Sequence, residues 1–437
     1  MFTKSNSSSE TQTAIAFISA SAGELDWPLP ILDYLLKKGF NVKIIFLTRR
    51  ARLSVKKNRM LDDYISQQNI QLEVYLLGGY FFEKIEHFAY LSHRISIKLK
   101  LNKKPIIKTA YNLLNNTLKQ FFLMSLPSEI LNLKSKKCLF FSEYPSLRRP
   151  RDLWLKDDFD NALFFYCPHS PNVYAEDLEK EYLDTQFKNF SNRYFLLLGH
   201  PADYFIINDG MELAATDIEK VFIGHPKFSN SWLHDLREKS NLFRSSLPIR
   251  NEINVLVLSR GSGSYLDEES HANLVEIAIK ATLDQKANYN LFIKKHPREE
   301  HSHWDAIEDK YPSLTIIDDH IMNIATSVDY VISFWSSGAM DCYALGVPVI
   351  ELWDPNKHSK QQVPVESGYT TISRLLGIAL PANNLEELVS AISSLESNNY
   401  ELPSSGPHIF FSDLMNRSNK WNTQIDKILL SHNLINS

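Results

Sequence analysis

The chain has 437 residues, of which 44% are hydrophobic and 22% are charged, and its formal net charge is −4. This balance is typical of a globular protein of two or three domains, and the small negative charge excludes a general attraction to nucleic acid. The three scattered cysteines have no zinc-ligand spacing, which favours a reducing compartment. Neither a signal peptide nor an apolar run of the about 20 residues that span a bilayer is found, so we expect a cytoplasmic protein.

The N-terminal half is predicted to be a Rossmann-like domain, residues 12–235. A buried strand (14–19), a small-residue loop, a helix ending at Gly39 and a second strand (41–47) form a β-α-β unit, which implies parallel strands. Further strands are predicted at 137–141, 162–167, 194–198 and 221–224.

The pattern of alternating strands and helices restarts near residue 251. A strand over 253–259, a glycine loop and a helix over about 268–283 open a second domain, 250–385. Further strands are predicted at 289–294, 314–317, 330–334 and 347–352. The fold class is therefore α/β, with two Rossmann-like domains facing a cleft and a C-terminal helical segment, 386–437.

Residues 94–137 are rich in lysine and carry Leu, Ile and Phe at helix-like intervals. One interpretation is a pair of surface helices with solvated lysines. The other is a basic amphipathic face that rests on anionic lipid.

A basic cluster, Lys294-Lys295-His296-Pro297-Arg298, follows one strand of the second domain. The carboxyl ends of parallel strands are the ligand-binding edge of such a sheet. Lysine and arginine supply charge there, and histidine can donate a hydrogen bond or a proton, so the cluster suits a phosphate. A solvated basic turn is the alternative.

Paired serines, Ser336 and Ser337, come with Gly338 where a strand ends and a helix begins. Backbone N–H groups and the helix dipole favour an anion at such a position. Plain helix capping by serine is the alternative.

A glycine loop, Arg260-Gly261-Ser262-Gly263, links the first strand of this domain to its helix. It lacks the third glycine of a dinucleotide fingerprint. It suits either a phosphate-facing loop or a tight connection.

The small-residue loop of the N-terminal domain leads to Glu24 and Asp26. A carboxylate partly withdrawn from water can act as a general base, and capping of the helix start is the alternative for Glu24. Asp209 is a weaker candidate base, and His169 and His225 are expected to be structural.

At these residues the sequence resembles the GT-B glycosyltransferases of bacterial surface polysaccharide synthesis, over roughly residues 12–400. His296-Pro297 and Ser336-Ser337 look like the HP and paired-serine motifs of bacterial sialyltransferases. The resemblance implies that both motifs bind the nucleotide phosphate of a CMP-sugar and that His296 assists the leaving group.

Two further resemblances qualify the first. The run from Ser336 through Asp341 to Pro348 is similar to CDP-glycerol glycerophosphotransferases, and the opening loop looks like that of Kdo transferases, which implies that Glu24 is the catalytic base. The acidic motif of sialyltransferases is reduced here to Asn208-Asp209-Gly210, which favours Glu24 over Asp209.

We therefore expect a metal-independent glycosyltransferase without a cofactor. It would transfer a sugar from a CMP-, CDP- or UDP-linked donor to a surface-polysaccharide or lipid-linked acceptor, at the inner face of the membrane or in the cytosol. Glu24 and His296 are the expected catalytic residues, and the expected donor-binding residues are Arg260, Gly261, Ser262, Gly263, Lys295, Pro297, Ser336, Ser337 and Gly338.

Rival interpretations are an isomerase like the non-hydrolysing UDP-N-acetylglucosamine 2-epimerases, a CDP-glycerol-type glycerophosphotransferase and a catalytically silent sugar-nucleotide binder. The epimerases have a similar Ser-Gly helix start. Their extended acidic signature is replaced here by Ser337-Gly-Ala-Met-Asp341.

Overall fold

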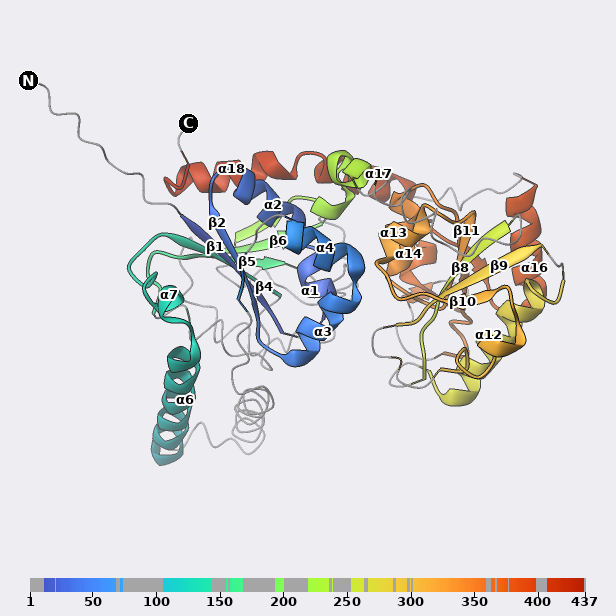
Figure 1. Cartoon of the computed structure of the whole chain (residues 1–437), viewed down its shortest axis with the longest axis horizontal. Helices are drawn as coiled ribbons and strands as arrows, with labels where there is room; N and C mark the ends of the chain where they lie inside the picture. The colour runs from blue at the N-terminus through green and yellow to red at the C-terminus, as the bar shows by residue number, and fades with distance from the viewer. Residues whose placement is uncertain are drawn as a thin grey trace, which may run out of the picture. The chain divides into compact units, whose positions relative to one another are not determined.

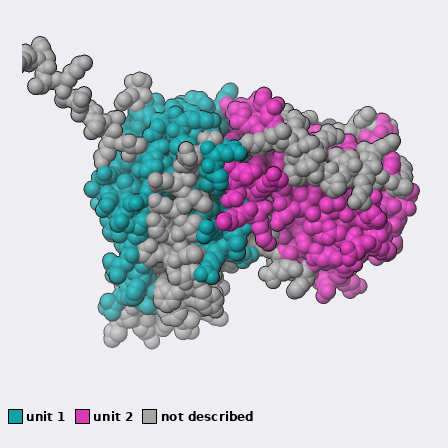
Figure 2. Space-filling model, in the orientation of Figure 1, with its two compact units in different colours: residues 1–55, 64–227, 420–437 teal, residues 56–63, 228–419 magenta. Residues whose placement is uncertain are grey.

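A computed structural model of the chain divides into two compact units (Figure 2). The N-terminal unit contains residues 1–55, 64–227 and 420–437, and the C-terminal unit contains 56–63 and 228–419. The structure describes residues 12–19, 21–67, 71–73, 105–143, 155, 158–167, 193–199, 219–235, 238, 253–262, 266–285, 288–296, 299, 302–358, 363–365, 368–375, 377–397 and 407–435.

The N-terminal unit is built on a parallel seven-stranded sheet with the order β3-β2-β1-β4-β5-β6-β7. Its central strands, such as β1, β5 and β6, read as nearly continuous apolar runs because parallel sheets are covered on both faces. The strands are β1 Thr13–Ile18, β2 Asn41–Phe46, β3 Gln71–Glu73, β4 Cys138–Glu143, β5 Leu163–Cys167, β6 Tyr194–Leu198 and β7 Glu219–Phe222.

Helices flank this sheet (Figure 1). They are α1 Gly23–Asp26, α2 Leu29–Lys37, α3 Arg49–Lys57, α4 Arg59–Gln67, α6 Pro105–Ser125, α7 Ser128–Leu131 and the C-terminal α18 Trp421–Ser431. Gly39 follows α2 with a φ of 87°, the left-handed conformation that commonly ends a helix. Although α18 is remote in sequence, the Tyr34 hydroxyl of α2 donates to Asp426 at 2.7 Å, so α18 is part of this unit.

Helix α6 has one buried and one exposed apolar face. Leu118, Phe122 and Leu123 belong to the core cluster of the sheet. Leu113, Phe121 and Met124 are 69%, 53% and 76% exposed. Among the described helices none has the length and apolar character to cross a bilayer.

The C-terminal unit is built on a parallel six-stranded sheet with the order β10-β9-β8-β11-β12-β15. This is the doubly wound order, in which the strand order reverses between β8 and β11. The strands are β8 Ile253–Leu258, β9 Tyr289–Lys294, β10 Leu314–Ile316, β11 Tyr330–Ser333, β12 Val349–Leu352 and β15 Leu380–Ala382, and a separate hairpin joins β13 Val363–Val365 to β14 Gly368–Thr370.

Helices also flank the second sheet (Figure 1). They are α12 Glu268–Ala281, α13 Ile321–Ala325, α14 Gly338–Ala344, α15 Ile372–Leu375, α16 Leu385–Glu396 and α17 Pro407–Ser418. Asp267 caps α12 by accepting the backbone N–H of Ser270 at 2.7 Å. The buried side of α12 packs with β8, β9 and α16 in one core cluster.

The α/β fold class with two Rossmann-like sheets is confirmed, as are the strands predicted in both halves. The prediction missed β3, β13, β14 and β15, each of three residues. Proline explains two of them, since Pro364 and Pro381 argue against a strand in sequence yet are tolerated in a hairpin and at a sheet edge.

Candidate functional site

Three loops of the C-terminal unit leave the sheet at the same level. In the strand register Leu258, the last residue of β8, pairs with Lys294 at the end of β9 and with Ser333 at the end of β11. The glycine loop (260–263), the His-Pro loop (294–298) and the serine loop (334–338) follow these three strands and therefore begin side by side. This edge includes the point where the strand order reverses, the usual ligand position in such sheets.

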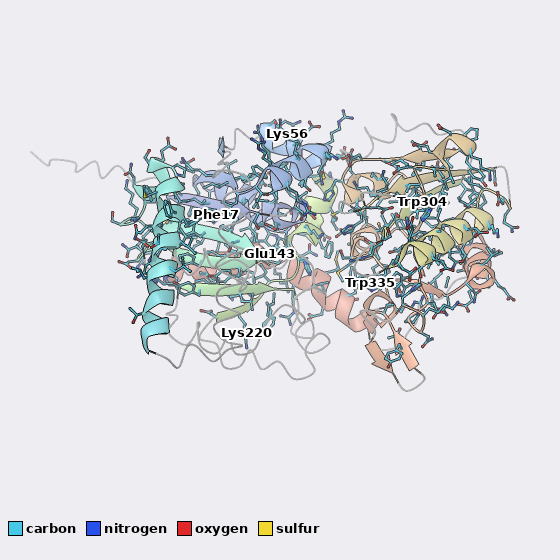
Figure 3. The ribbon with its side chains drawn as sticks, turned by 90° about the horizontal axis from the view of Figure 1, so that it is seen from below. Phe17, Lys56, Glu143, Lys220, Trp304 and Trp335 are labelled. Carbon is cyan, nitrogen blue, oxygen red and sulfur yellow. The ribbon has the colours of Figure 1, made fainter. Side chains whose placement is uncertain are left out.

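Arg260 connects the glycine loop to the serine loop. Its guanidinium lies 4.3 Å from the centre of the Trp335 ring and donates to the Trp335 carbonyl at 3.2 Å. Trp335, labelled in Figure 3, has a φ of 49°, an uncommon conformation for a bulky residue. Its ring also packs against Trp353 at 5.7 Å between centroids. Trp335 thus contacts Arg260 through both its ring and its carbonyl group.

Glu299 connects the glycine loop to the His-Pro loop. Its carboxylate accepts the Ser259 hydroxyl at 3.0 Å, the Ser302 hydroxyl and the backbone N–H of His296 at 3.2 Å. The Glu299 N–H in turn donates to the His296 carbonyl at 2.8 Å. Sequence reasoning missed Glu299, because an acidic residue within a basic run has the pattern of a solvated turn.

Gly261 is a glycine for a steric reason. A Cβ placed there would lie 2.2 Å from Cγ of Glu299. The sequence suited either a phosphate-facing loop or a tight connection here, and at position 261 the close neighbour is a side chain of the same protein. Ser262, the next residue, is half-buried.

Two buried rings surround the Ser259–Glu299 contact. The Trp304 indole N–H donates to the Ser259 hydroxyl at 2.9 Å, and Nε2 of His271 lies 3.5 Å from the Glu299 carboxylate. Burial, assisted by His303, lowers the pKa of His271 to about 4. His271 is therefore neutral at pH 7, and its contact with Glu299 is not an ion pair.

The serine loop is held by hydrogen bonds between its own residues. The Ser336 hydroxyl accepts the backbone N–H of Gly338 at 3.3 Å, and the Ser336 N–H donates to the Ser333 hydroxyl at 3.0 Å. Ser337 is exposed and makes no side-chain cap bond to α14. A Cβ at Gly338 would lie 2.2 Å from Cδ1 of Ile321 in α13, so this glycine allows the two helices to pack.

The lysines of the His-Pro loop have carboxylate partners. Lys295 pairs with Asp305 at 2.7 Å, and Lys294 lies 3.4 Å from Asp318. Burial lowers the pKa of Lys294. The His296 residue between these lysines and Glu299 is half-buried.

Glu24 lies in the N-terminal unit beyond the carboxyl end of β1. It is 5% exposed, and its carboxylate accepts the backbone N–H of Ser19 at 2.6 Å and the Ser19 hydroxyl at 3.0 Å. Strand β1 lies beside β4 at the reversal point of this sheet, and β4 ends with the half-buried carboxylate Glu143 (Figure 3). The sequence analysis missed Glu143, although its position at the end of an apolar run was a usable signal.

Two further candidates of the N-terminal unit, His225 and Asp26, are buried and bonded to neighbouring side chains. His225 is 1% exposed and its Nδ1 accepts the Trp27 indole N–H at 2.6 Å. Burial, with a contribution from Lys227, lowers the pKa of His225 to about 3. Asp26 pairs with Lys227 at 3.1 Å.

Of the expected site residues, the structure brings Arg260, Gly261, Ser262, Lys295, His296, Ser336, Ser337 and Gly338 to one edge of one sheet. Gly263, Pro297, Asp209 and His169 lie outside the described residues. Within the part of the chain that the structure describes, no group of three or more His, Cys, Asp or Glu side chains could hold a metal ion.

Comparison with known proteins extends these observations. Residues 226–348 match the family model of alpha-2,8-polysialyltransferases, and this stretch contains all three loops. Among curated proteins no sequence match is found.

Solved structures match over nearly the whole chain. UDP-GlcNAc 2-epimerase from Neisseria meningitidis, bound to UDP-GlcNAc, covers 96% of this chain and 100% of its own at 11% identity, with a TM-score of 0.54. The Methanocaldococcus jannaschii UDP-GlcNAc 2-epimerase in complex with UDP-GlcNAc and UDP covers 95% and 99% at 12% identity, with a TM-score of 0.53. At this identity the likeness shows the fold. The chain thus has the fold of these epimerases, and the resemblance to sialyltransferases that the His-Pro and paired-serine motifs indicated is confirmed over residues 226–348.

Proposed function

We propose that the protein is a glycosyltransferase that takes its sugar from a nucleotide-activated donor, with a CMP-linked sialic acid as the first candidate. The observation that carries this proposal is that β8, β9 and β11 end at the same level of the sheet. Arg260, His296 and Ser336 lie in the loops that follow these three strand ends. The match of the same residues to polysialyltransferases supports the choice of donor.

In the proposed reaction, the donor phosphate binds against the three loops. The acceptor hydroxyl attacks the anomeric carbon, the bond from that carbon to the phosphate oxygen breaks, and the nucleotide leaves with the bonding electrons. Arg260 and the backbone of the serine loop stabilise the growing negative charge. His296 donates a hydrogen bond or a proton to the leaving phosphate. General acid catalysis of this kind typically raises the rate by a factor of about 10²–10⁴.

The base in this proposal is Glu24, which takes the proton of the acceptor hydroxyl. Its position after β1, at the reversal point of the N-terminal sheet, supports this role. Glu143, at the end of the neighbouring strand, is the matched comparison. Replacement of Glu24 by Gln should abolish transfer and leave nucleotide binding intact, whereas Glu143→Gln should retain transfer. The reverse result would assign the base to Glu143.

The proposal is tested by incubating purified protein with CMP-sialic acid, UDP-GlcNAc or CDP-glycerol, with and without an oligosialic acid acceptor, and separating the products. We expect acceptor elongation and release of CMP. Conversion of UDP-GlcNAc without an acceptor would instead identify an epimerase, and glycerol phosphate transfer would identify a glycerophosphotransferase. No turnover of any donor, combined with nucleotide binding in a thermal-shift assay, would leave a silent binder.

We further propose that transfer needs no metal. The cationic side chains of Arg260 and Lys295, with a hydrogen bond from His296, can stabilise the negative charge that a metal would otherwise balance. The rate of transfer should therefore be unchanged by excess EDTA. A loss that Mg²⁺ or Mn²⁺ restores would contradict this part of the proposal.

Contact with the inner face of the membrane would bring the enzyme to a lipid-linked acceptor. Residues 87–128 contain seven Lys and Arg residues and no Asp or Glu, although the whole chain has a net charge of −4. Within this stretch α6 exposes Leu113, Phe121 and Met124. A basic segment with an exposed apolar helical face is the pattern of a protein that rests on anionic lipid.

Sedimentation with vesicles tests this contact. The protein should bind vesicles that contain phosphatidylglycerol and not pure phosphatidylcholine vesicles, and binding should weaken with salt. The triple variant Leu113→Ser, Phe121→Ser, Met124→Ser should lose binding, whereas Leu53→Ser, at another exposed leucine, should not. Equal binding to both kinds of vesicle, or by the triple variant, would refute the contact.

A further inference from the structure

The buried side chain of Glu299 joins two of the three loops through opposite sides of its carboxylate. One oxygen accepts the hydroxyl of Ser259, the residue before Arg260, at 3.0 Å. The other accepts the backbone N–H of His296 at 3.2 Å. The Glu299 side chain is 0% exposed, so each of these bonds replaces water that the carboxylate has lost.

The same side chain also supports the glycine loop by direct packing. The 2.2 Å separation between a Cβ at position 261 and Cγ of Glu299 means that the loop backbone rests on the Glu299 methylene groups. The position of the loop therefore depends on the length of this side chain as well as on its charge.

Among the described residues, the hydrogen-bond partners of Glu299 are hydroxyl and backbone groups and not the cations of the site. Lys295 pairs with Asp305, and Arg260 is held by Trp335. The ring of His271, whose Nε2 lies 3.5 Å from the Glu299 carboxylate, is neutral at pH 7 because burial lowers its pKa to about 4. The contacts of Glu299 thus fix backbone positions and do not neutralise the cationic groups of the two loops.

We infer that Glu299 is a positioning residue for donor binding, which sets the glycine loop and the His296 turn relative to each other. The inference rests on the proposed function, because it assigns Arg260 and His296 to one phosphate. Loss of the Glu299 contacts would displace both residues together. Misplacement of this kind lowers the rate even where the reacting groups are untouched.

Conservative variants separate positioning from folding. Glu299→Gln keeps the shape of the side chain but replaces one acceptor by a donor, and Glu299→Asp keeps the charge but shortens the reach. Glu276→Gln, at a 61% exposed carboxylate of α12, is the control. Titration calorimetry with CMP and with UDP, kcat and KM for transfer, and the melting temperature are measured for each.

We expect both Glu299 variants to bind nucleotide at least 10-fold more weakly and to lower kcat as well, while the control matches the wild type. Unchanged affinity and kcat in the folded variants, with a lower melting temperature alone, would overturn the inference and reduce Glu299 to a structural role. Absence of nucleotide binding by the wild type would overturn the proposed function itself, and with it the inference. The two failures are therefore distinguishable.

A size-compensating pair gives a second test. Gly261→Ala alone forces a methyl group into Cγ of Glu299 and should weaken nucleotide binding. In the background of Glu299→Ala, which removes that Cγ, the same substitution should cause a much smaller further loss, since residues in contact are not additive. Full additivity of the two losses would contradict the packing on which the inference depends.

Discussion

The dipeptide His-Pro follows a parallel strand at residues 225–226 of the N-terminal unit and at residues 296–297 of the C-terminal unit, and these two histidines have opposite surroundings. His225, after β7, is 1% exposed and bonded to Trp27, and its pKa is lowered to about 3. His296, after β9, is half-buried in a polar turn that Glu299 closes. Neighbours from other segments, and not the dipeptide itself, therefore decide whether such a histidine is sealed in the core or lies in a polar turn.

Exchange of each histidine for alanine gives the largest expected contrast. His296→Ala should lower kcat by on the order of 100-fold or more with an unchanged melting temperature, since it removes the proposed acid. His225→Ala should instead destabilise the fold by about 2–4 kcal/mol, because it leaves a cavity and a buried indole N–H without its acceptor. Both variants are compared by kinetics and by urea unfolding. Similar effects in the two would show that the two histidines do not differ in role.

The salt bridges beside the two dipeptides should differ in the same sense. Asp26 and Lys227 are only 10% and 13% exposed at the side chain. Replacement of Asp26 by Asn removes the carboxylate that pairs with the buried Lys227 ammonium and should lower the unfolding free energy by about 3 kcal/mol. Urea unfolding measures the loss, and a change below about 1 kcal/mol would place this pair with ordinary surface pairs.

The buried histidine should make the N-terminal unit sensitive to acid. His225 is neutral in the folded state and has its ordinary pKa when unfolded, so the unfolded state binds the extra proton between pH 6.5 and about 3. Stability is therefore complete above pH 6.5 and decreases as the pH falls, by about 2 kcal/mol at pH 5. His225→Gln, which keeps an acceptor for Trp27, should flatten this dependence when unfolding is followed at pH 7 and pH 5. An equally steep dependence in the variant would assign the acid sensitivity to other groups.

The smallest effect is expected at the more exposed pair of the C-terminal unit. Asp305 is 49% exposed and Lys295 29%. Asp305→Asn should change stability by less than about 1 kcal/mol. Because it releases Lys295 for an anionic ligand, it should tighten CMP binding a few-fold in a calorimetric titration. Weaker binding would show that Asp305 holds Lys295 in a useful position.

The sheets could be predicted from the sequence because parallel strands carry their signal locally, in apolar runs such as those of β1 and β8. The positions of His296 and Ser336 at one edge followed from strand order. The role of Gly261 could not be predicted, since its neighbour Glu299 is remote in sequence. The left-handed conformation of Trp335 could not be predicted either, because no local pattern places a bulky aromatic residue in that conformation.

Apart from residues 56–63, which also belong to the C-terminal unit, the chain enters that unit at residue 228 and returns to the N-terminal unit at 420. A single cut therefore cannot separate two complete halves. A fragment that stops at 227 would lack α18 and leave Tyr34 without Asp426, whereas a fragment over 228–419 would have every strand of its own sheet. Attempts to isolate the C-terminal unit, the proposed donor-binding half, should begin from those two residues, and the remaining half is best produced with its C-terminal helix supplied through a short linker.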